Sequence, residues 1–283
     1  NPPRPVPLPP TLRTADGLAL RLVDWTGDAA RGTVLIVHGL GEHAERYGHV
    51  AQWLATRGFR VIGYDQRGHG QSEGMRGDVP SATALLEDLE LVVDAARPAT
   101  GPLILLGHSM GGAIAARFVA EERRRVDFLI LTSPALAAEL SFGQRLQLWI
   151  GERVVPSIAV SNQLDVQRIS HDSAVVRAYL EDPLVHDRLS PRLARMVLQS
   201  GEYARAAASH WTVPTLLLYA GADALVSPSG SDAFAAAAPR ALVDAERFEG
   251  LYHEILNEDA QRAEPVFDRL QRWLNAKVPR STG

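Results

Sequence analysis

The feature that most constrains this 283-residue chain is the turn Gly-His-Ser-Met-Gly at residues 107–111. The residues before it, 103–106, are a short apolar run that predicts a buried strand, and residues 113–122 after it have a helical pattern. A serine on so sharp a turn, here Ser109, is forced into a strained backbone conformation, and glycine on both sides admits the close approach of strand and helix. Because the bare five-residue pattern is common, the flanking strand and helix carry the interpretation.

Short apolar runs elsewhere in the chain predict the rest of a sheet. Residues 33–37, 60–64 and 103–106 are rich in Val, Ile and Leu without polar alternation, which is typical of strands covered on both faces. Helical patterns at 46–57 and 81–96 separate these runs, and such alternation indicates an α/β fold with a mostly parallel sheet flanked by helices. The other expected elements are a hairpin at 11–25, strands at 128–132, 215–219 and 243–248, and a closing helix at 260–276.

One long interval interrupts this alternation. Residues 135–211 are too many for a crossover between two strands, and they have a helical pattern punctuated by prolines. We therefore expect an inserted helical cap at 135–211 and a core made of 11–134 and 212–283. Residues 1–10 contain six prolines and are expected to form an extended tail.

A serine hydroxyl is a poor nucleophile at neutral pH, so Ser109 needs a general base. Among the nine histidines, His253 follows the last expected strand and precedes the closing helix. Asp223 follows the strand at 215–219 and would fix the imidazole tautomer and stabilise the imidazolium. The chain order Ser, Asp, His is the order that this kind of fold uses. For most of the other histidines, a surface-loop position is the simpler interpretation.

A tetrahedral intermediate also needs donors for its oxyanion, each worth on the order of 3 kcal/mol. The expected donors are the backbone amides of Met110 and of Leu40, which lies in the loop after the strand at 33–37. His108 is expected to face inward. Asp65 is the chief rival for the acid, but it precedes the serine in the chain, so we expect a structural role for it, with Arg67 as its partner.

With these residues in view, the chain resembles the monoacylglycerol lipase-like branch of the α/β-hydrolase superfamily, which also contains lysophospholipase-like and carboxylesterase members. The resemblance covers most of the chain and rests on His-Gly-Leu-Gly-Glu-His at 38–43, on the segment 64–74, and on Gly-His-Ser-Met-Gly-Gly at 107–112. Ser-His-Asp at 170–172 and Asp-Pro-Leu at 182–184 look like cap motifs of that branch. The resemblance implies an α/β-hydrolase fold and hydrolysis, without a cofactor, of single-chain acyl esters such as monoacylglycerols through an acyl-enzyme.

In that branch the cap sets acyl selectivity, and the expected cap of this chain has an unusually apolar segment. The residues predicted to line an acyl tunnel are Leu140, Phe142, Leu146, Trp149, Ile150, Val154 and Ile158, with Val226 from the loop after Asp223. The same segment contains Leu136, Leu148 and Val155. The alternative is that half of these side chains simply pack the cap onto the sheet, since any amphipathic helix buries one face. A transient membrane contact through the cap is a further possibility.

Charge and composition narrow the expected partners. The formal net charge of -4 gives no electrostatic footprint for nucleic acid. The chain has no Cys, and its histidines do not have metal-ligand spacing, so neither a metal nor a cofactor is expected. No run of 18 apolar residues exists, and we expect a cytoplasmic protein without a transmembrane segment. The chain begins with Asn1, so an export signal upstream would not be seen.

Several functions remain open at this stage. Lysophospholipases, serine peptidases and carbon-carbon hydrolases use a serine on the same fold, whereas epoxide hydrolases and haloalkane dehalogenases need a carboxylate in its place. A non-catalytic ligand-binding protein is the alternative from another class, because fold does not fix function. The natural substrate, the oligomeric state and any opening of the cap are not fixed by the sequence.

Overall fold

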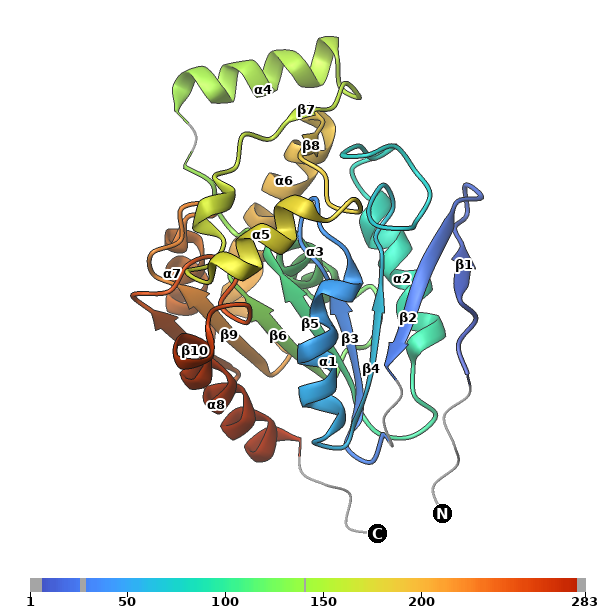
Figure 1. Ribbon diagram of the computed structural model, residues 1–283, viewed down its shortest axis with the longest axis vertical. Coiled ribbons are helices and arrows are strands. Elements are labelled where there is room, and N and C mark those ends of the chain that lie inside the picture. Colours follow the sequence, from blue (N-terminus) through green and yellow to red (C-terminus); the bar gives the residue numbers. More distant parts are fainter. Residues whose placement is uncertain (1–6, 26–28, 140, 279–283) are drawn as a thin grey trace.

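The computed structural model describes residues 7–25, 29–139 and 141–278, and this part of the chain forms one sheet with helices on both faces (Figure 1). The sheet has eight strands there, in the order β1-β2-β4-β3-β5-β6-β9-β10. The strands β4, β3, β5, β6, β9 and β10 are parallel, which confirms the mostly parallel sheet. The strands β1 and β2 form the predicted antiparallel hairpin, and β2 pairs antiparallel with β4 at one edge of the sheet. The bounds are β1 Thr11–Arg13, β2 Ala19–Trp25, β3 Gly32–Val37, β4 Phe59–Tyr64, β5 Leu103–His108, β6 Phe128–Thr132, β9 Thr215–Ala220 and β10 Val243–Phe248.

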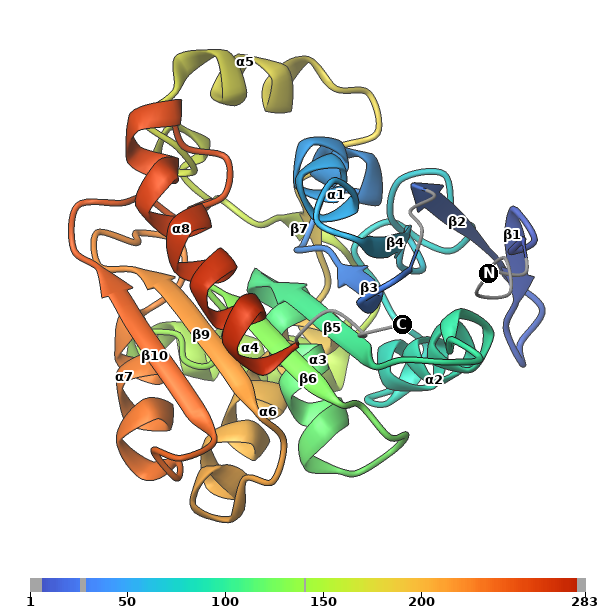
Figure 2. The ribbon, with the colours of Figure 1, turned by 90° about the horizontal axis from the view of Figure 1, so that it is seen from below.

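Helices cover both faces of the sheet (Figure 2), and one hydrophobic cluster lies between the helices and the sheet on each face. Along β3, Val34 and Ile36 point into the cluster under α1 and α8, whereas Leu35 and Val37 point into the cluster under α2, α3, α6 and α7. Because both faces are buried, the strands have the unbroken apolar runs seen in the sequence. The helix bounds are α1 Gly48–Ala55, α2 Ala84–Ala96, α3 Ser109–Ala120, α6 Pro191–Ala207, α7 Pro228–Ala237 and α8 Ala260–Lys277.

The largest boundary difference lies at the serine turn. The strand β5 continues to His108, and α3 begins at Ser109 itself rather than at the predicted residue 113. Residues 111 and 112 are glycines, which have low helix propensity, so the sequence pattern does not extend the helix back to the serine. The helix predicted at 46–57 is a short 3-10 turn, η1 Ala44–Tyr47, followed by α1.

The prediction that the interval 135–211 is helical throughout is wrong, because the interval contains an antiparallel pair of two-residue strands, β7 and β8. Its last helix, α6, packs against α3, and its residues Leu193, Met196 and Ala204 belong to the main core cluster. We therefore propose that the cap proper ends where α6 begins. The elements before α6 are α4 Phe142–Val154, β7 Val160–Ser161, η2 Val166–Arg168, α5 Ser173–Glu181 and β8 Arg188–Leu189, and η3 Ala208–His210 follows it.

Helix α4 lies at the outer end of the molecule, away from the sheet (Figure 1). A reciprocal capping box starts it, because Ser141 Oγ accepts a hydrogen bond from the Gln144 amide and the Gln144 side chain accepts one from the Ser141 amide. Apolar side chains along α4 are nevertheless exposed, and Val154 reaches 70%. In the part of the chain that the structure describes, every helix falls short of the length and apolarity that a membrane-crossing segment requires.

Candidate active site

The serine turn has the strained geometry that the sequence predicts. Ser109 has φ +52°, in the left-handed region that side chains rarely adopt. Glycine is required behind it, because a Cβ on Gly111 would lie 2.2 Å from the Val37 carbonyl oxygen. A Cβ on Gly112 would lie 2.7 Å from Cβ of Pro134. The turn is therefore pressed against its neighbours, which holds the Ser109 hydroxyl at the carboxyl end of β5.

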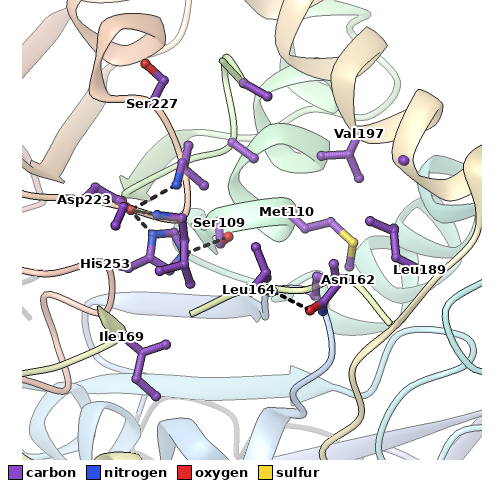
Figure 3. A pocket seen from close by; sticks show the side chains of 18 of the residues that line it. Ser109, Met110, Asn162, Leu164, Ile169, Leu189, Val197, Asp223, Ser227 and His253 are labelled. Carbon is purple, nitrogen blue, oxygen red and sulfur yellow. Dashed lines mark hydrogen bonds and ion pairs between the residues drawn. The ribbon is translucent and has the colours of Figure 1, made fainter. Parts of the chain in front are cut away.

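Three loops at this edge of the sheet bring Ser109, His253 and Asp223 together (Figure 3). His253 Nε2 lies 2.9 Å from Ser109 Oγ, and His253 Nδ1 lies 2.6 Å from Asp223 Oδ2. The other carboxylate oxygen of Asp223 accepts hydrogen bonds from the Leu225 and Val226 amides, at 2.9 and 3.0 Å. The carboxyl ends of parallel strands share one edge of a sheet, so residues that are far apart in the chain meet there. The three predicted side chains form one continuous hydrogen-bonded relay.

Burial opposes charge on both members of the His253–Asp223 pair, but their mutual attraction prevails. Burial lowers the pKa of His253, yet the carboxylates of Asp223, Glu254 and Glu42 outweigh it and the pKa lies above its ordinary value. Burial raises the pKa of Asp223, yet the imidazole and the two backbone amides bring it below its ordinary value. The site therefore favours an imidazolium beside a carboxylate, which is the state that follows proton transfer from the serine.

Both predicted oxyanion donors border the cavity next to Ser109. The Met110 amide is in the first turn of α3, where backbone N–H groups have no partner within the helix. Leu40 lies on the turn after β3, and the preceding residue approaches the serine closely, since a Cβ on Gly39 would lie 3.2 Å from Ser109 Cβ. The Gly39 amide donates to Glu42 Oε1 at 2.6 Å, which fixes this turn. Both residues thus lie beside Ser109, and the role of their amides as oxyanion donors stays a prediction.

A cavity of about 700 Å³ extends from Ser109 between the core and the cap. Its apolar lining includes Ile169, Leu189, Val197 and Leu198. Its polar lining includes Gln144, Asn162, Gln163 and Ser227. This volume suits a small-molecule ligand with an apolar chain and a polar end.

Most of the predicted acyl-tunnel residues lie elsewhere. Val226 lines the cavity, as does Leu148 from the same apolar segment. Leu140 and the side chain of Phe142 lie outside the described residues. The other five predicted tunnel residues do not line the cavity, and their side chains are 45 to 70% exposed, so this part of the prediction is wrong. They are Leu146, Trp149, Ile150, Val154 and Ile158.

The geometry of α4 explains this difference. Gln144 and Leu148, four residues apart, share the face that meets the cavity. Leu146, Ile150 and Val154 follow each other at the same spacing along another face, which points to solvent. Hydrophobicity alone could not separate the two faces, because both carry apolar residues.

Two residues near the turn have structural roles. His108 faces inward as predicted, with Nδ1 3.0 Å from the Thr132 carbonyl oxygen. Burial, and to a smaller extent the positive charge of His253, lowers the pKa of His108 to about 4. Asp65 accepts hydrogen bonds from the Ala44 and Gln71 amides, at 2.9 and 2.8 Å.

The predicted partner of Asp65 is wrong. Its carboxylate lies 3.6 Å from a guanidinium nitrogen of Arg21. Arg67 instead pairs with Asp88 and Asp16. The sequence suggested Arg67 because it is close in the chain, but the turn points the two side chains in different directions.

The model of the serine aminopeptidase family S33, also called Hydrolase_4, matches residues 28–260. This chain belongs to that family. A monoacylglycerol lipase of Mycolicibacterium smegmatis is 34% identical over 256 residues, which cover 88% of this chain and 90% of the relative. An uncharacterized abhydrolase domain-containing protein of Dictyostelium discoideum is 34% identical over 277 residues, 94% of this chain, and the match spans 29% of that relative's length.

Solved structures of the family agree. The crystal structure of a monoacylglycerol lipase of Paleococcus ferrophilus superposes with a TM-score of 0.83 at 31% identity, over 91% of this chain and 99% of that one. These similarities confirm the predicted α/β-hydrolase fold and the predicted monoacylglycerol lipase-like branch.

Proposed function

We propose that this chain is a serine hydrolase that cleaves carboxylic esters, with monoacylglycerols as its most specific substrate class. His253 Nε2 accepts the proton of Ser109 Oγ as this oxygen attacks the ester carbonyl carbon. The amides of Leu40 and Met110 donate to the oxyanion. When the intermediate collapses, His253 returns the proton to the departing alcohol and leaves an acyl group on Ser109. Water, activated by the same imidazole, then releases the fatty acid.

The observation that carries this proposal is the unbroken relay from Ser109 through His253 to Asp223, with contacts of 2.9 and 2.6 Å. A ligand-binding protein without catalysis has no use for a strained serine aligned with a base. The cavity supports an ester with one acyl chain, since its lining combines apolar side chains with a few amides and hydroxyls. The relatives named monoacylglycerol lipases support the same substrate class.

Among the alternatives, an aminopeptidase would need a free carboxylate in the cavity to bind the substrate's amino group. Glu42 and Glu254 border the cavity, but both are paired with Arg46. Glu139 accepts a hydrogen bond from the Ser227 hydroxyl at 2.8 Å. The ion pairs of Glu42 and Glu254 with Arg46 favour an ester over an aminoacyl amide, whereas Glu139, with a neutral hydroxyl partner, keeps its negative charge.

A substrate panel tests the proposal. Nitrophenyl esters of rising chain length, monoacylglycerols, lysophospholipids and aminoacyl amides are offered to the wild-type chain and to Ser109→Ala. We expect turnover of the esters by the wild type only, and labelling of Ser109 by a fluorophosphonate. Amide turnover without ester turnover would contradict the assignment, and a folded chain that never labels would favour a ligand-binding protein.

We also propose that the exposed face of α4 makes transient contact with lipid aggregates. Leu146, Trp149, Ile150 and Val154 lie exposed along this helix, which forms one wall of the cavity through Leu148. An apolar helix face next to the cavity suits an enzyme whose substrate resides in lipid.

A further inference from the structure

A buried ion triad next to the relay has no part in the mechanism described so far. Arg46, in η1, lies between Glu42 and Glu254, and the exposed fractions of the three side chains are only 10, 3 and 6%. Both terminal nitrogens of Arg46 contact Glu254, at 2.7 and 2.8 Å, and one of them also contacts Glu42. Removing two carboxylates and a guanidinium from water is costly, and hydrophobic residues would often stabilise a fold equally well. The triad therefore calls for an explanation beyond stability.

One end of the triad holds the turn that presents the Leu40 amide. Glu42 Oε1 accepts hydrogen bonds from the Gly39 amide and from the Tyr47 hydroxyl, each at 2.6 Å. Burial raises the pKa of Glu42, but the charge of Arg46, with smaller contributions from His108, His38 and the Tyr47 hydroxyl, outweighs it. The pKa is therefore lowered and the carboxylate stays ionised. An ionised Glu42 keeps the amide of Gly39 occupied and so fixes the turn whose next residue, Leu40, borders the cavity.

The other end holds the loop of the general base. Glu254 directly follows His253, its amide donates to the Ile169 carbonyl at 2.8 Å, and its carboxylate accepts from Asn257 Nδ2 at 2.8 Å. Because Arg46 donates a hydrogen bond to each oxygen of Glu254, rotation of this carboxylate is restricted. The guanidinium thus connects the loop after β3 to the loop after β10.

The cap contacts the same group. The ring of Tyr179, on α5, lies 4.7 Å from the Arg46 guanidinium carbon and also borders the cavity. Just beyond α5, Asp182 Oδ2 lies 2.8 Å from His43 Nε2, and the His186 amide donates to the Gly41 carbonyl at 2.9 Å. The loop after β3 is consequently tied to the cap and to the loop of the base at once.

We propose that Arg46 is a positioning residue that holds the oxyanion turn and the His253 loop in register through its ion pairs with Glu42 and Glu254. This inference rests on the serine hydrolase function proposed above. Its effect is on the transition state, because the amide of Leu40 meets a full negative charge only there.

The first test compares Arg46→Gln with Arg46→Lys on a nitrophenyl ester. We expect Arg46→Gln to lower kcat by about 10- to 100-fold, since a displacement near 1 Å can cost 100-fold, with KM changed by less than about threefold. Lysine offers one ammonium instead of a planar fork, so Arg46→Lys restores part of kcat. Affinity for a trifluoromethyl ketone, which forms an oxyanion on Ser109, is expected to fall by the same factor as kcat.

A charge-neutral variant separates positioning from folding. The triple change Glu42→Gln, Arg46→Met and Glu254→Gln leaves no unpaired buried charge, so its melting temperature is expected to stay near that of the wild type. Its kcat is expected to remain low, because no group connects the two loops. As a matched control, Asp88→Asn on α2 breaks the buried pair with Arg67 outside the site. We expect this variant to melt earlier with kcat unchanged.

The outcomes are distinct. Reduced kcat with unchanged KM in both Arg46→Gln and the triple variant, beside normal kcat in Asp88→Asn, supports the inference. A triple variant that melts like the wild type and keeps wild-type kcat overturns it, as does a rise in KM alone. If the wild-type chain itself turns over no ester, the proposed function fails first and the inference falls with it.

Discussion

The catalytic loops and helix α4 differ in how the fold supports them. His253 is 4% exposed and bonded on both ring nitrogens. Ser109 and Asp223 follow the fully buried strands β5 and β9, and His253 lies on the loop after the edge strand β10. On α4, by contrast, Trp149 is 54% and Val154 70% exposed. Chemistry requires positions fixed to fractions of an ångström, so it resides where both faces of the sheet are packed. The lipid contact proposed for α4 needs accessible apolar surface, and α4 exposes such surface.

The largest expected effect lies in the relay. Asp223→Asn keeps the shape of the side chain but cannot hold the imidazole in the same tautomer or stabilise its positive charge. We expect kcat to fall by about 10³- to 10⁴-fold while the melting temperature changes little, because the strand end is retained. Steady-state kinetics and thermal unfolding of the same preparation measure both. Unchanged turnover would move the acid role to another residue.

A pair of glycine changes compares the two regions directly for stability. Gly111→Ala brings a Cβ to 2.2 Å from the Val37 carbonyl oxygen, so we expect a loss of ~3 kcal/mol or more and a melting temperature lower by about 5 to 10 °C. Gly143→Ala, on α4, meets no atom closer than 3.9 Å and is expected to be neutral or to stabilise by up to about 1 kcal/mol. Equal effects in thermal unfolding would contradict the contrast between the regions.

Changes on the exposed face of α4 test whether this region affects lipid binding without affecting catalysis. Trp149→Ser combined with Ile150→Ser is expected to lower partition onto phospholipid vesicles by about 10- to 100-fold. The factor is modest because a side chain at a lipid surface is only partly buried and contributes less than the roughly 1.5–3 kcal/mol of full burial. Because these side chains do not line the cavity, kcat on a water-soluble nitrophenyl ester stays within about twofold. Vesicle co-sedimentation and ester kinetics measure the two. An unchanged partition would assign the lipid contact to another surface.

The smallest expected change concerns pH. The His253 imidazole must be neutral to accept the serine proton, and its raised pKa places the midpoint of the acid limb of kcat/KM above about 6.5. Below that midpoint, activity falls about tenfold for each pH unit. Glu254→Gln removes one of the negative charges that raise this pKa, so the midpoint moves to lower pH. A shift to higher pH would contradict this electrostatic account.

The positions of the strands along the chain and the residues of the relay could be predicted from the sequence because both depend on local signals. Unbroken apolar runs mark buried strands, and the glycines around Ser109 mark the turn. Membership of the predicted superfamily branch is confirmed, whereas the roles of the site residues remain proposals with the tests given above.

The cavity lining could not be predicted, because it depends on how the segment 155–190, which connects α4 to α6, folds over the sheet. One signal was present in α6, where Leu193 and Met196 face the core while Val197 and Leu198 border the cavity. When a helix has two apolar faces, one can pack in the core while the other contacts a ligand, and the second face of α6 forms part of the cavity wall. The partner of Asp65 could not be predicted either, since Arg21 is distant in sequence.

The backbone of Ser109 limits which nucleophiles evolution or design can place there. A φ of +52° is tolerated by an unbranched side chain, but a residue that branches at Cβ is a steric outlier in this region. Threonine, although it carries the same hydroxyl chemistry, is thereby disfavoured at position 109. Exchange for cysteine keeps the side-chain shape, so a thiol is the replacement that this turn accommodates.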